Sequence, residues 1–209
     1  MTATLYLTDI RRIAGGGRRA EEKIFAFSPE RARGLSAFRR EKDRLRSLAA
    51  GLLLREILGA SKILYGEHGK PYVPGGPHFN VSHSGDRVAL AVDEAPVGVD
   101  IEEHVEDDYR ALARTAFHEN ELIFLEDVPV SALAQAFFDI WTLKESYLKM
   151  LGSGLSVNPA SFAVKIHGQD ACVASDPRPC LRLYDLGGYS LALCSLISGC
   201  PEKFEEVFL

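Results

Sequence analysis

The stretch of residues 131–155, SALAQAFFDIWTLKESYLKMLGSGL, constrains the fold more than any other part of the chain. Its apolar side chains recur every three or four residues, which is the spacing of one buried face of an α-helix. The glycines that follow let the backbone turn sharply where the helix ends. The sequence therefore predicts a long amphipathic helix whose buried face consists of Leu133, Ala136, Phe137, Ile140, Trp141, Tyr147, Leu148 and Leu151.

One charged residue lies within that apolar face. Lys144 falls in its middle, while Glu145 and Lys149 lie on its border, one helical turn apart. The Lys144 stem can run through the core to water, or its ammonium group can meet an anion at the edge of a cleft. The charged neighbours and the glycine-rich exit at residues 152–154 favour the cleft.

The remaining pattern predicts an α+β fold with two pseudo-symmetric lobes. Each lobe has a small antiparallel sheet packed on a long helix. The helix of the first lobe spans residues 36–58, and Gly59 follows it as a C-terminal cap. We place the boundary near Pro96, which gives lobes of residues 1–96 and 97–209. The predicted strands are 4–8, 79–83, 87–92, 97–102, 162–167, 181–186 and 189–196, and residues 106–126 are predicted to be mainly helical.

Composition excludes several classes of protein. Hydrophobic residues make up 46% of the chain, yet no apolar run approaches the ~18 residues of a membrane span. The net charge of −5 argues against general nucleic-acid binding. The N-terminus lacks the charge order of a secretory signal, so we expect a cytoplasmic protein. The four cysteines have no C-x-x-C spacing, which indicates reduced thiols rather than a metal site.

Two carboxylates on a predicted strand are candidate metal ligands. Asp100 and Glu102 are two residues apart, so their side chains project from the same face. An all-oxygen set suits Mg²⁺ or Mn²⁺, which bind one or two carboxylates together with phosphate oxygens. The alternative is a solvated strand end, because carboxylates are mostly exposed. Glu145 would complete the cluster, and Lys144 and Lys149 would answer the remaining phosphate charge.

A second group of residues is suited to a phosphate or a ribose. Ser82, His83 and Ser84 supply hydrogen-bond donors where a strand ends. The alternative for His83 is an ordinary surface histidine, and for the basic residues a solvated face. Signatures of serine hydrolases, P-loop proteins and zinc peptidases are absent from the sequence. Further positive charge and polar contacts would come from Arg31, Arg46, Ser47 and Lys70.

The segments FNVSHSG, VGVDIE and WTLKESYLKMLGSGL, in this order and at these separations, resemble the three motifs of the 4′-phosphopantetheinyl transferases. The length and the two-lobe pattern resemble the monomeric, surfactin-synthetase-activating type. The resemblance extends from SPERAR to the final strands, with GKP and SHS as supporting motifs. It implies an enzyme that moves the phosphopantetheine arm of coenzyme A onto a serine of an apo acyl or peptidyl carrier protein. The same resemblance implies that adenosine 3′,5′-bisphosphate is the released product.

The resemblance also implies roles for the acidic and basic residues. Asp100, Glu102 and Glu145 would hold Mg²⁺, or Mn²⁺, against the pyrophosphate of coenzyme A, and Lys144 and Lys149 would contact the phosphates. Attack by the serine hydroxyl needs a base, for which Glu145 is the candidate. Glu102 and a metal-bound water are the alternatives. Glu145 and Lys149 are thus the candidate catalytic residues.

The nucleotide end of coenzyme A would meet a different set of residues. By the same resemblance, Ser82 and His83 would bind the 3′-phosphate, and Lys70 and Pro71 would border the adenine. Gly34 departs from the family, which often has a basic residue there. Further phosphate contacts would come from Arg31, Arg46 and Ser47.

Two other functions fit some of these residues. A protein that binds coenzyme A or a carrier without catalysis would not need the acidic set. A Mg²⁺-dependent nucleotide pyrophosphohydrolase would transfer to water and would not need a surface for a carrier protein.

Overall fold

The computed structural model describes residues 2–14, 20–22, 24–25, 29–59, 63–66 and 68–209. Its helices are α1 (Arg11–Ala14), α3 (Pro29–Leu35), α4 (Glu41–Leu58), α5 (Tyr109–Ala116), α6 (Glu119–Asp127) and α7 (Val130–Leu151), with 3-10 turns at Gly154–Ser156 and Pro159–Ser161. Its strands are β1 (Thr4–Asp9), β2 (Leu64–Tyr65), β3 (Pro71–Tyr72), β4 (His78–Ser84), β5 (Arg87–Asp93), β6 (Val97–Glu103), β7 (Val164–His167), β8 (Asp170–Val173), β9 (Asp176–Asp185), β10 (Tyr189–Ser195) and β11 (Glu205–Glu206). None of the helices within these ranges is long and apolar enough to cross a bilayer.

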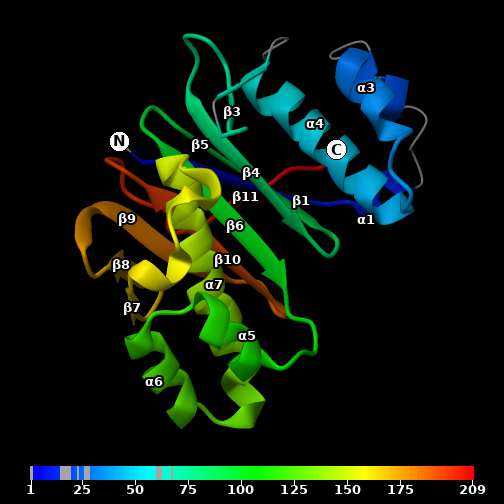
Figure 1. The fold of residues 1–209 in the computed structure, drawn as a ribbon. Coiled ribbons are helices and arrows are strands. Elements are labelled where there is room, and N and C mark those ends of the chain that lie inside the picture. Colours follow the sequence, from blue (N-terminus) through cyan, green and yellow to red (C-terminus); the bar gives the residue numbers. More distant parts are fainter. Residues whose placement is uncertain (1, 15–19, 23, 26–28, 60–62, 67) are drawn as a thin grey trace.

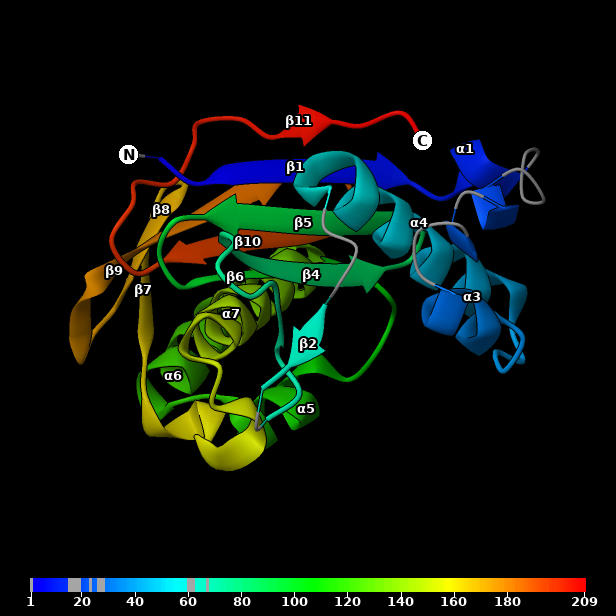
Figure 2. The same cartoon turned by 90° about the horizontal axis from the view of Figure 1, so that it is seen from above.

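These elements form the predicted α+β fold. The larger sheets have the strand orders β11-β1-β5-β4 and β6-β10-β9-β8-β7, and β2 and β3 form a separate hairpin (Figures 1 and 2). The predicted strands of both lobes are present. The sequence pattern missed the short strands β2, β3, β8 and β11, which carry too few alternating residues to stand out.

Helix α4 packs on the first sheet. It begins at Glu41, five residues later than predicted, because Arg40 has an extended backbone (φ −104°, ψ 131°). Acidic residues fill its first turn, where they face the positive end of the helix dipole. The predicted cap at its other end is confirmed, because Gly59 is left-handed (φ 59°) and its N–H donates to the carbonyl of Arg55.

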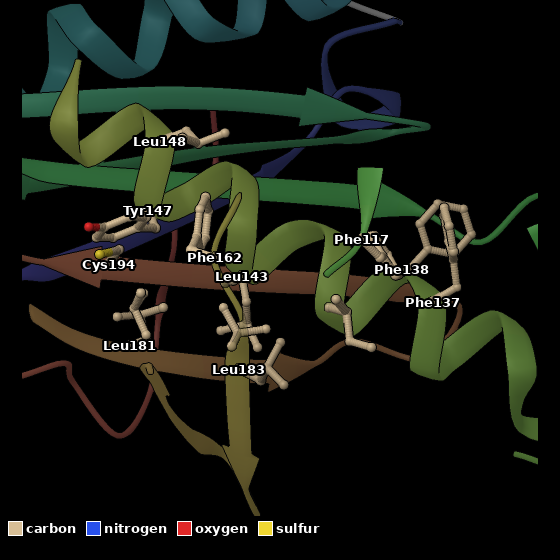
Figure 3. Close-up of a cluster of buried hydrophobic side chains, with 14 of the residues drawn as sticks. Phe117, Phe137, Phe138, Leu143, Tyr147, Leu148, Phe162, Leu181, Leu183 and Cys194 are labelled. Carbon is tan, nitrogen blue, oxygen red and sulfur yellow. The ribbon is translucent and has the colours of Figure 1, made fainter. Parts of the chain in front are cut away.

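Helix α7 corresponds to the long helix predicted from the sequence. It lies across β6 and β10 and ends at Gly152, which adopts φ 69°. Figure 3 shows the apolar cluster that forms around it. Aromatic side chains from α7, the end of α5 and the loop before β7 pack there against β9 and β10. Members of the cluster include Phe117, Phe137, Phe138, Leu143, Tyr147, Leu148, Phe162, Leu181, Leu183 and Cys194.

The two sheets pack against each other through alternate residues. In β5, Ala89 and Ala91 face the second sheet, whereas Val88 and Leu90 face α4. In β6, Val97, Val99 and Ile101 face the first sheet, so the residues between them, including Asp100, are directed toward α7. The strand period of two thus assigns the apolar residues of β6 to the core and its acidic residues to the helix side.

The C-terminal segment returns to the first sheet. β11 pairs in parallel with β1, and the hydroxyl of Thr8 donates to the carbonyl of Val207 at 2.8 Å. Figure 2 shows this segment running alongside β1. The predicted second lobe, residues 97–209, therefore includes a C-terminal end, residues 205–207, that pairs with the first sheet and not with the second.

Gly98 lets β6 approach α7 closely. A Cβ atom at this position would lie 2.0 Å from the carbonyl oxygen of Ser146 and 2.4 Å from the backbone nitrogen of Met150. These are helix backbone atoms, so they can yield only if α7 moves. The glycine thus sets the distance between Asp100, two residues later, and the charged face of α7.

We expect Gly98→Ala to lower the free energy of unfolding by about 1–3 kcal/mol or more, because it overpacks a backbone contact. Chemical denaturation followed by circular dichroism measures this. Gly34→Ala is the matched control, since a Cβ there meets nothing within 4 Å. Equal stability of the two variants would contradict the proposed close approach.

Candidate active site

The site is built on a seam between β4 and β6. Three alternate side chains of β4 accept hydrogen bonds from the backbone of β6. Asn80 Oδ1 accepts from the N–H of Val99 at 2.9 Å, and the hydroxyls of Ser82 and Ser84 accept from Ile101 at 3.4 Å and Glu103 at 3.1 Å. These side chains take the place of a backbone ladder and fix the register of β6.

The same two serines orient the acidic residues of β6. The Ser82 hydroxyl donates to Asp100 Oδ1 at 2.8 Å, and the Ser84 hydroxyl donates to Glu102 at 2.8 Å. The Ser82 side chain is buried and turned toward Asp100, which it positions, and its contact with a 3′-phosphate stays a prediction. Sequence reasoning missed the role of Ser84 and Asn80. The matching period of two in N-V-S-H-S and in D-I-E was the available signal.

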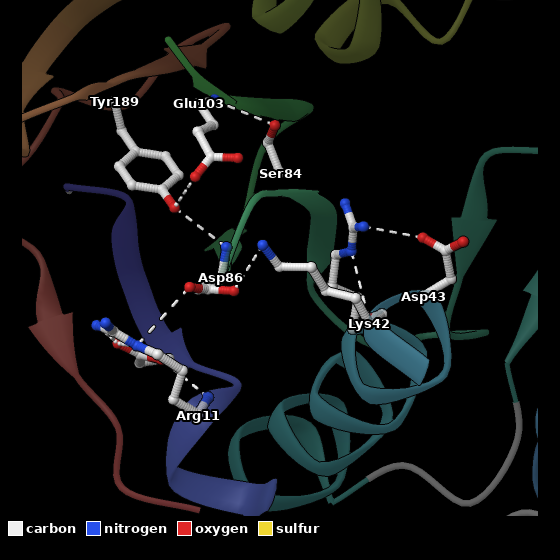
Figure 4. A network of polar contacts seen from close by, with 9 residues as sticks. Arg11, Lys42, Asp43, Ser84, Asp86, Glu103 and Tyr189 are labelled. Carbon is white, nitrogen blue, oxygen red and sulfur yellow. Dashed lines mark hydrogen bonds and ion pairs between the residues drawn. The ribbon is translucent and has the colours of Figure 1, made fainter. Parts of the chain in front are cut away.

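A polar network closes the far end of the seam (Figure 4). The hydroxyl of Tyr189 donates to Glu103 at 3.0 Å and accepts from the N–H of Asp86 at 3.1 Å. Lys42 from α4 forms an ion pair with Asp86 at 2.9 Å. Gly85 takes a left-handed conformation (φ 53°) with the Tyr189 hydroxyl against it. The turn between β4 and β5 is thereby joined to both β10 and α4.

Asp100 is the centre of the site. Its residue is 2% exposed, and Lys149 Nζ lies 2.5 Å from Oδ1. The other oxygen, Oδ2, is buried and has no hydrogen-bond partner among the described residues. Burial raises the pKa of Asp100, while Lys149 and the Ser82 hydroxyl oppose that shift. A buried carboxylate oxygen without a partner is costly unless a ligand meets it.

Two further carboxylates lie within electrostatic reach of Asp100. Burial raises the pKa of both Glu102 and Glu145, and the negative charge of Asp100 raises each further. The charge of Asp100 thus acts on Glu145 as well as on Glu102. That the three carboxylates share one metal stays a prediction. As they stand, no three His, Cys, Asp or Glu side chains in the described part of the chain are gathered tightly enough to enclose a metal ion. The carboxylates still suit a cation that completes its coordination with phosphate oxygens.

A cavity of about 330 Å³ opens beside this cluster. Glu145 and Lys149 line it from α7, and Lys70 and Pro71 line it from the β2–β3 hairpin. The side chain of Lys149 is 30% exposed, so its ammonium group lies at the rim of the protein interior. The cavity thus brings two residues predicted for the metal and phosphates together with two predicted for the adenine.

Lys70 has an unexpected role within this wall. Its ammonium donates to the carbonyls of Lys149 at 2.6 Å, Val97 at 3.0 Å and Met150 at 3.2 Å. Burial lowers the pKa of Lys70 to about 8. The lysine therefore ties the hairpin to the end of α7 and to the start of β6, and its charged group points into the protein. That Lys70 and Pro71 border an adenine remains a prediction.

His83 belongs to a second cavity of about 290 Å³ between β4 and α4, which Ser47 also lines. Burial lowers the pKa of His83, and the charge of Arg46 contributes to that shift, so Arg46 lies near. Arg46 itself pairs with Asp43 at 2.9 Å. Arg31 is in α3, but its side chain lies outside the described part of the structure. Three of the residues predicted for the nucleotide thus share one region.

The prediction that Lys144 contacts a phosphate is wrong. Lys144 is 0% exposed, and its ammonium donates to both carboxylate oxygens of Glu121, at 2.7 and 2.8 Å, and to the carbonyl of Phe162 at 2.6 Å. The anion it meets is internal, on α6. Glu121 lies with Leu125 on the buried face of α6, so charged residues on the apolar faces of both helices were the signal for this pair.

Comparison with known proteins now decides the family. The profile described as the 4′-phosphopantetheinyl transferase superfamily matches residues 96–194. The chain is 35% identical over 183 residues to the 4′-phosphopantetheinyl transferase gsp of Aneurinibacillus migulanus, covering 82% of this chain and 77% of the relative. The chain belongs to the 4′-phosphopantetheinyl transferase superfamily. The predicted family and enzyme class are thereby confirmed.

A second transferase relative covers even more of the chain. The 4′-phosphopantetheinyl transferase Sfp of Bacillus subtilis is 33% identical over 202 residues, 89% of this chain and 90% of the relative. Among solved structures, a holo-(acyl-carrier-protein) synthase from Bacillus anthracis in complex with CoA (3′,5′-ADP) gives a TM-score of 0.44 at 20% identity, covering 50% of this chain and 97% of that one. The superfamily profile includes β6 and α7, and therefore Asp100, Glu102, Glu145 and Lys149.

Proposed function

We propose that this transferase moves the 4′-phosphopantetheine arm of coenzyme A to a serine of an apo acyl or peptidyl carrier protein and releases adenosine 3′,5′-bisphosphate. The observation that carries the proposal is the buried, unpartnered Oδ2 of Asp100. Asp100 contacts Lys149, and Lys149 lines a cavity together with Glu145. Carboxylates in such a setting are suited to a divalent cation and the diphosphate that the cation neutralises.

In this proposal Asp100, Glu102 and Glu145 hold Mg²⁺, and Mn²⁺ suits the same oxygen donors. The metal, when bound, supplies positive charge that offsets the charge developing on the pyrophosphate. Ser82 and Ser84 keep two of the three carboxylates oriented. The orphaned oxygen of Asp100 and the mutual repulsion of the carboxylates both support the fit of a cation.

The side chains of α7 carry the chemical step in this scheme. Lys149 contacts Asp100 in the ligand-free site. When coenzyme A is bound, Lys149 also donates to one of its phosphates and stabilises charge on the leaving group. Glu145 takes the proton of the carrier serine as this serine attacks the β-phosphorus. The raised pKa of Glu145, caused by burial and then by Asp100, suits a proton acceptor better than an ordinary exposed carboxylate would be.

The second cavity and its neighbours would hold the 3′-phosphate end of the nucleotide, and the adenine would lie against the hairpin wall of the first cavity. His83 and Arg46 bind the 3′-phosphate region, with further contacts from Ser47 and Arg31, while Pro71 and the stem of Lys70 border the adenine. The proposal includes a monomeric, cytoplasmic enzyme that binds neither nucleic acid nor membranes. The negative net charge of −5 supports the absence of nucleic-acid binding.

One experiment tests the proposed reaction. The chain is incubated with Mg²⁺, coenzyme A and each of several apo carrier proteins, and intact-mass spectrometry is used to detect one added phosphopantetheine per carrier. Modification that requires the chain, Mg²⁺ and the carrier serine would support the proposal. Cleavage of coenzyme A without a carrier would indicate a pyrophosphohydrolase, and binding without either product would indicate a non-catalytic homologue.

The metal site makes a separate prediction. Mg²⁺ should raise the melting temperature of the wild-type chain and should have little effect on Asp100→Asn, because a ligand that binds only the folded state stabilises it. The Mg²⁺-dependent shift should shrink as the pH is lowered from about 8 to about 5, since carboxylates with raised pKa values take up protons that compete with the metal.

Differential scanning fluorimetry measures both effects. Asp107→Asn is the control. Asp107 is exposed and lies in the loop after β6, so this variant should keep the full Mg²⁺ response. A response of Asp100→Asn equal to that of the wild type would place the cation elsewhere.

A further inference from the structure

Two cysteines from separate segments meet on the second sheet. Cys180 is in β9, and Cys200 follows β10. The backbone N–H of Cys200 donates to the sulfur of Cys180 at 3.1 Å, and the thiol of Cys200 lies 3.8 Å from the carbonyl oxygen of Leu193, to which it donates. Both residues are partly exposed, whereas Cys194, on the face of β10 that packs toward α7, is buried. The pair is therefore within reach of a small reagent.

The environment makes the two sulfurs unequal. Hydrogen bonds from Cys200 lower the pKa of Cys180 to about 6 despite burial, with a smaller opposing effect from Asp170 and a small supporting effect from Arg182. The same hydrogen bond and burial raise the pKa of Cys200. The contact thus favours the thiolate of Cys180 over that of Cys200. A partly exposed cysteine whose thiolate is favoured, next to a second thiol, is the usual arrangement of a reactive cysteine and its resolving partner.

The position of Cys200 in the chain gives the pair a structural consequence. Cys200 lies in the segment that follows β10, leaves the second sheet and runs to β1 (Figure 2). Gly199 bridges to Thr2, and the carbonyl of Pro201 accepts a hydrogen bond from Tyr184 of β9 at 2.7 Å. A bond between the two sulfurs would fasten the start of this segment to β9 covalently.

We propose that Cys180 and Cys200 are a redox-sensitive thiol pair, which small-molecule disulfides oxidise to an intramolecular disulfide that secures the C-terminal segment. The Cys180 thiolate attacks one sulfur of the small disulfide, forms a mixed disulfide and releases one small thiolate. Cys200 then loses its proton to solvent and attacks the Cys180 sulfur, which releases the second small thiol. Two protein thiols are oxidised as one small disulfide is reduced to two thiols.

The pair lies away from the proposed metal cluster. Asp100 is opposite Ala192 in the ladder of β6 and β10, on the side of the second sheet that faces α7. Cys180 is opposite Ser195, on the face that Cys200 and Tyr184 share. Oxidation should therefore change the stability of the folded chain and leave transfer activity within about twofold, so the pair can be tested whether or not the proposed function holds.

The test uses the full chain and oxidised glutathione. After oxidation, free thiols are alkylated and the digest is mapped by mass spectrometry. We expect a peptide linked between Cys180 and Cys200, with Cys172 and Cys194 alkylated. Closing a loop of this length should raise the melting temperature by about 5–10 °C, and a reducing agent should reverse the rise.

Two variants complete the test. Cys200→Ser should stop the reaction at a glutathione adduct on Cys180, while Cys172→Ser, on the neighbouring strand β8, should form the linked peptide like the wild type. A linked peptide that joins Cys172 to Cys180 would overturn the proposal. So would equal alkylation rates of Cys180 and Cys172 at neutral pH, or the absence of any adduct on Cys180 in the Cys200→Ser variant.

Discussion

Replacing Glu145 with glutamine should lower the rate of phosphopantetheine transfer by about a thousandfold or more while the fold stays intact. The change keeps the size of the side chain and removes its negative charge, so the site loses a metal ligand and its candidate base together. Positive charge at a phosphoryl centre is worth several kcal/mol, and each 1.36 kcal/mol is a factor of ten in rate. The rate is measured by intact-mass spectrometry of the carrier.

The stability of the same variant gives an independent readout. Because burial and Asp100 raise the pKa of Glu145, its charged form is disfavoured in the folded chain. This cost is fully present above the folded pKa and falls as the pH drops through it. Glu145→Gln should therefore melt at or slightly above the wild-type temperature in metal-free buffer at neutral pH. A slow variant that also melts much lower would indicate a structural role instead.

Glu94→Gln is the control for this experiment. Glu94 is exposed in the turn between β5 and β6, and its loss should leave the rate within about twofold. If Glu145→Gln kept most of its activity, Glu145 would have no place in the mechanism. A loss confined to the Mg²⁺-dependence would retain Glu145 as a ligand and favour Glu102 as the base.

The sequence predicts the elements of this fold well where one period runs through many residues. The long helix α7 and the strands 87–92 and 97–102 are of this kind, because side chains that repeat at 3.6 or 2 residues identify the type of element directly. The buried face predicted for α7 was wrong at Leu151, which is 41% exposed, and it omitted the buried Phe138 and Met150. β11 could not be predicted in this way. It is two residues long and is held by pairing with β1, which lies at the other end of the chain.

The candidate site divides along a similar line. The strand period alone predicts that Asp100 and Glu102 project from the same face of β6. The contact between Asp100 and Lys149 agrees with the placement of both residues in one site, which the motifs implied. Which cation meets which anion does not follow from the sequence. Lys70 and Lys144 both looked suited to phosphate, yet the fold uses one to bind carbonyls at the end of α7 and the other to bind Glu121. The packing of the hairpin and of α6 against α7 decides those contacts, and no period encodes it.

The buried pair of Lys144 and Glu121 gives the largest expected effect on stability. Glu121 accepts hydrogen bonds from Lys144, from the backbone of His118 at 2.8 Å and from the backbone of Val164 at 2.8 Å. It thereby links α6, α7 and β7. Glu121→Gln leaves the Lys144 ammonium buried without an opposite charge, and we expect a loss of about 3–5 kcal/mol in the free energy of unfolding. Urea denaturation of the purified variant measures it.

Two comparison variants separate burial from charge loss. Glu41→Gln removes the carboxylate of an exposed pair with Arg44 and should change stability little, because exposed pairs contribute little. The double variant of Glu121→Gln with Lys144→Met removes both charges and should recover part of the lost stability, since an apolar replacement of a buried pair is tolerated better than half of the pair. Equal losses in the Glu121→Gln and Glu41→Gln variants would contradict the buried pair.

The same variants decide between the two interpretations of Lys144 at the level of function. If Lys144 bound a phosphate, Lys144→Met would raise the KM for coenzyme A at every temperature. If it serves only Glu121, transfer by Lys144→Met should keep the wild-type KM below its melting transition and fail above it. The structure requires the second result, because the ammonium is enclosed by Glu121, the carbonyl of Phe162 and the ring of Phe162, 4.5 Å away. A raised KM in the folded variant would return Lys144 to the coenzyme A site.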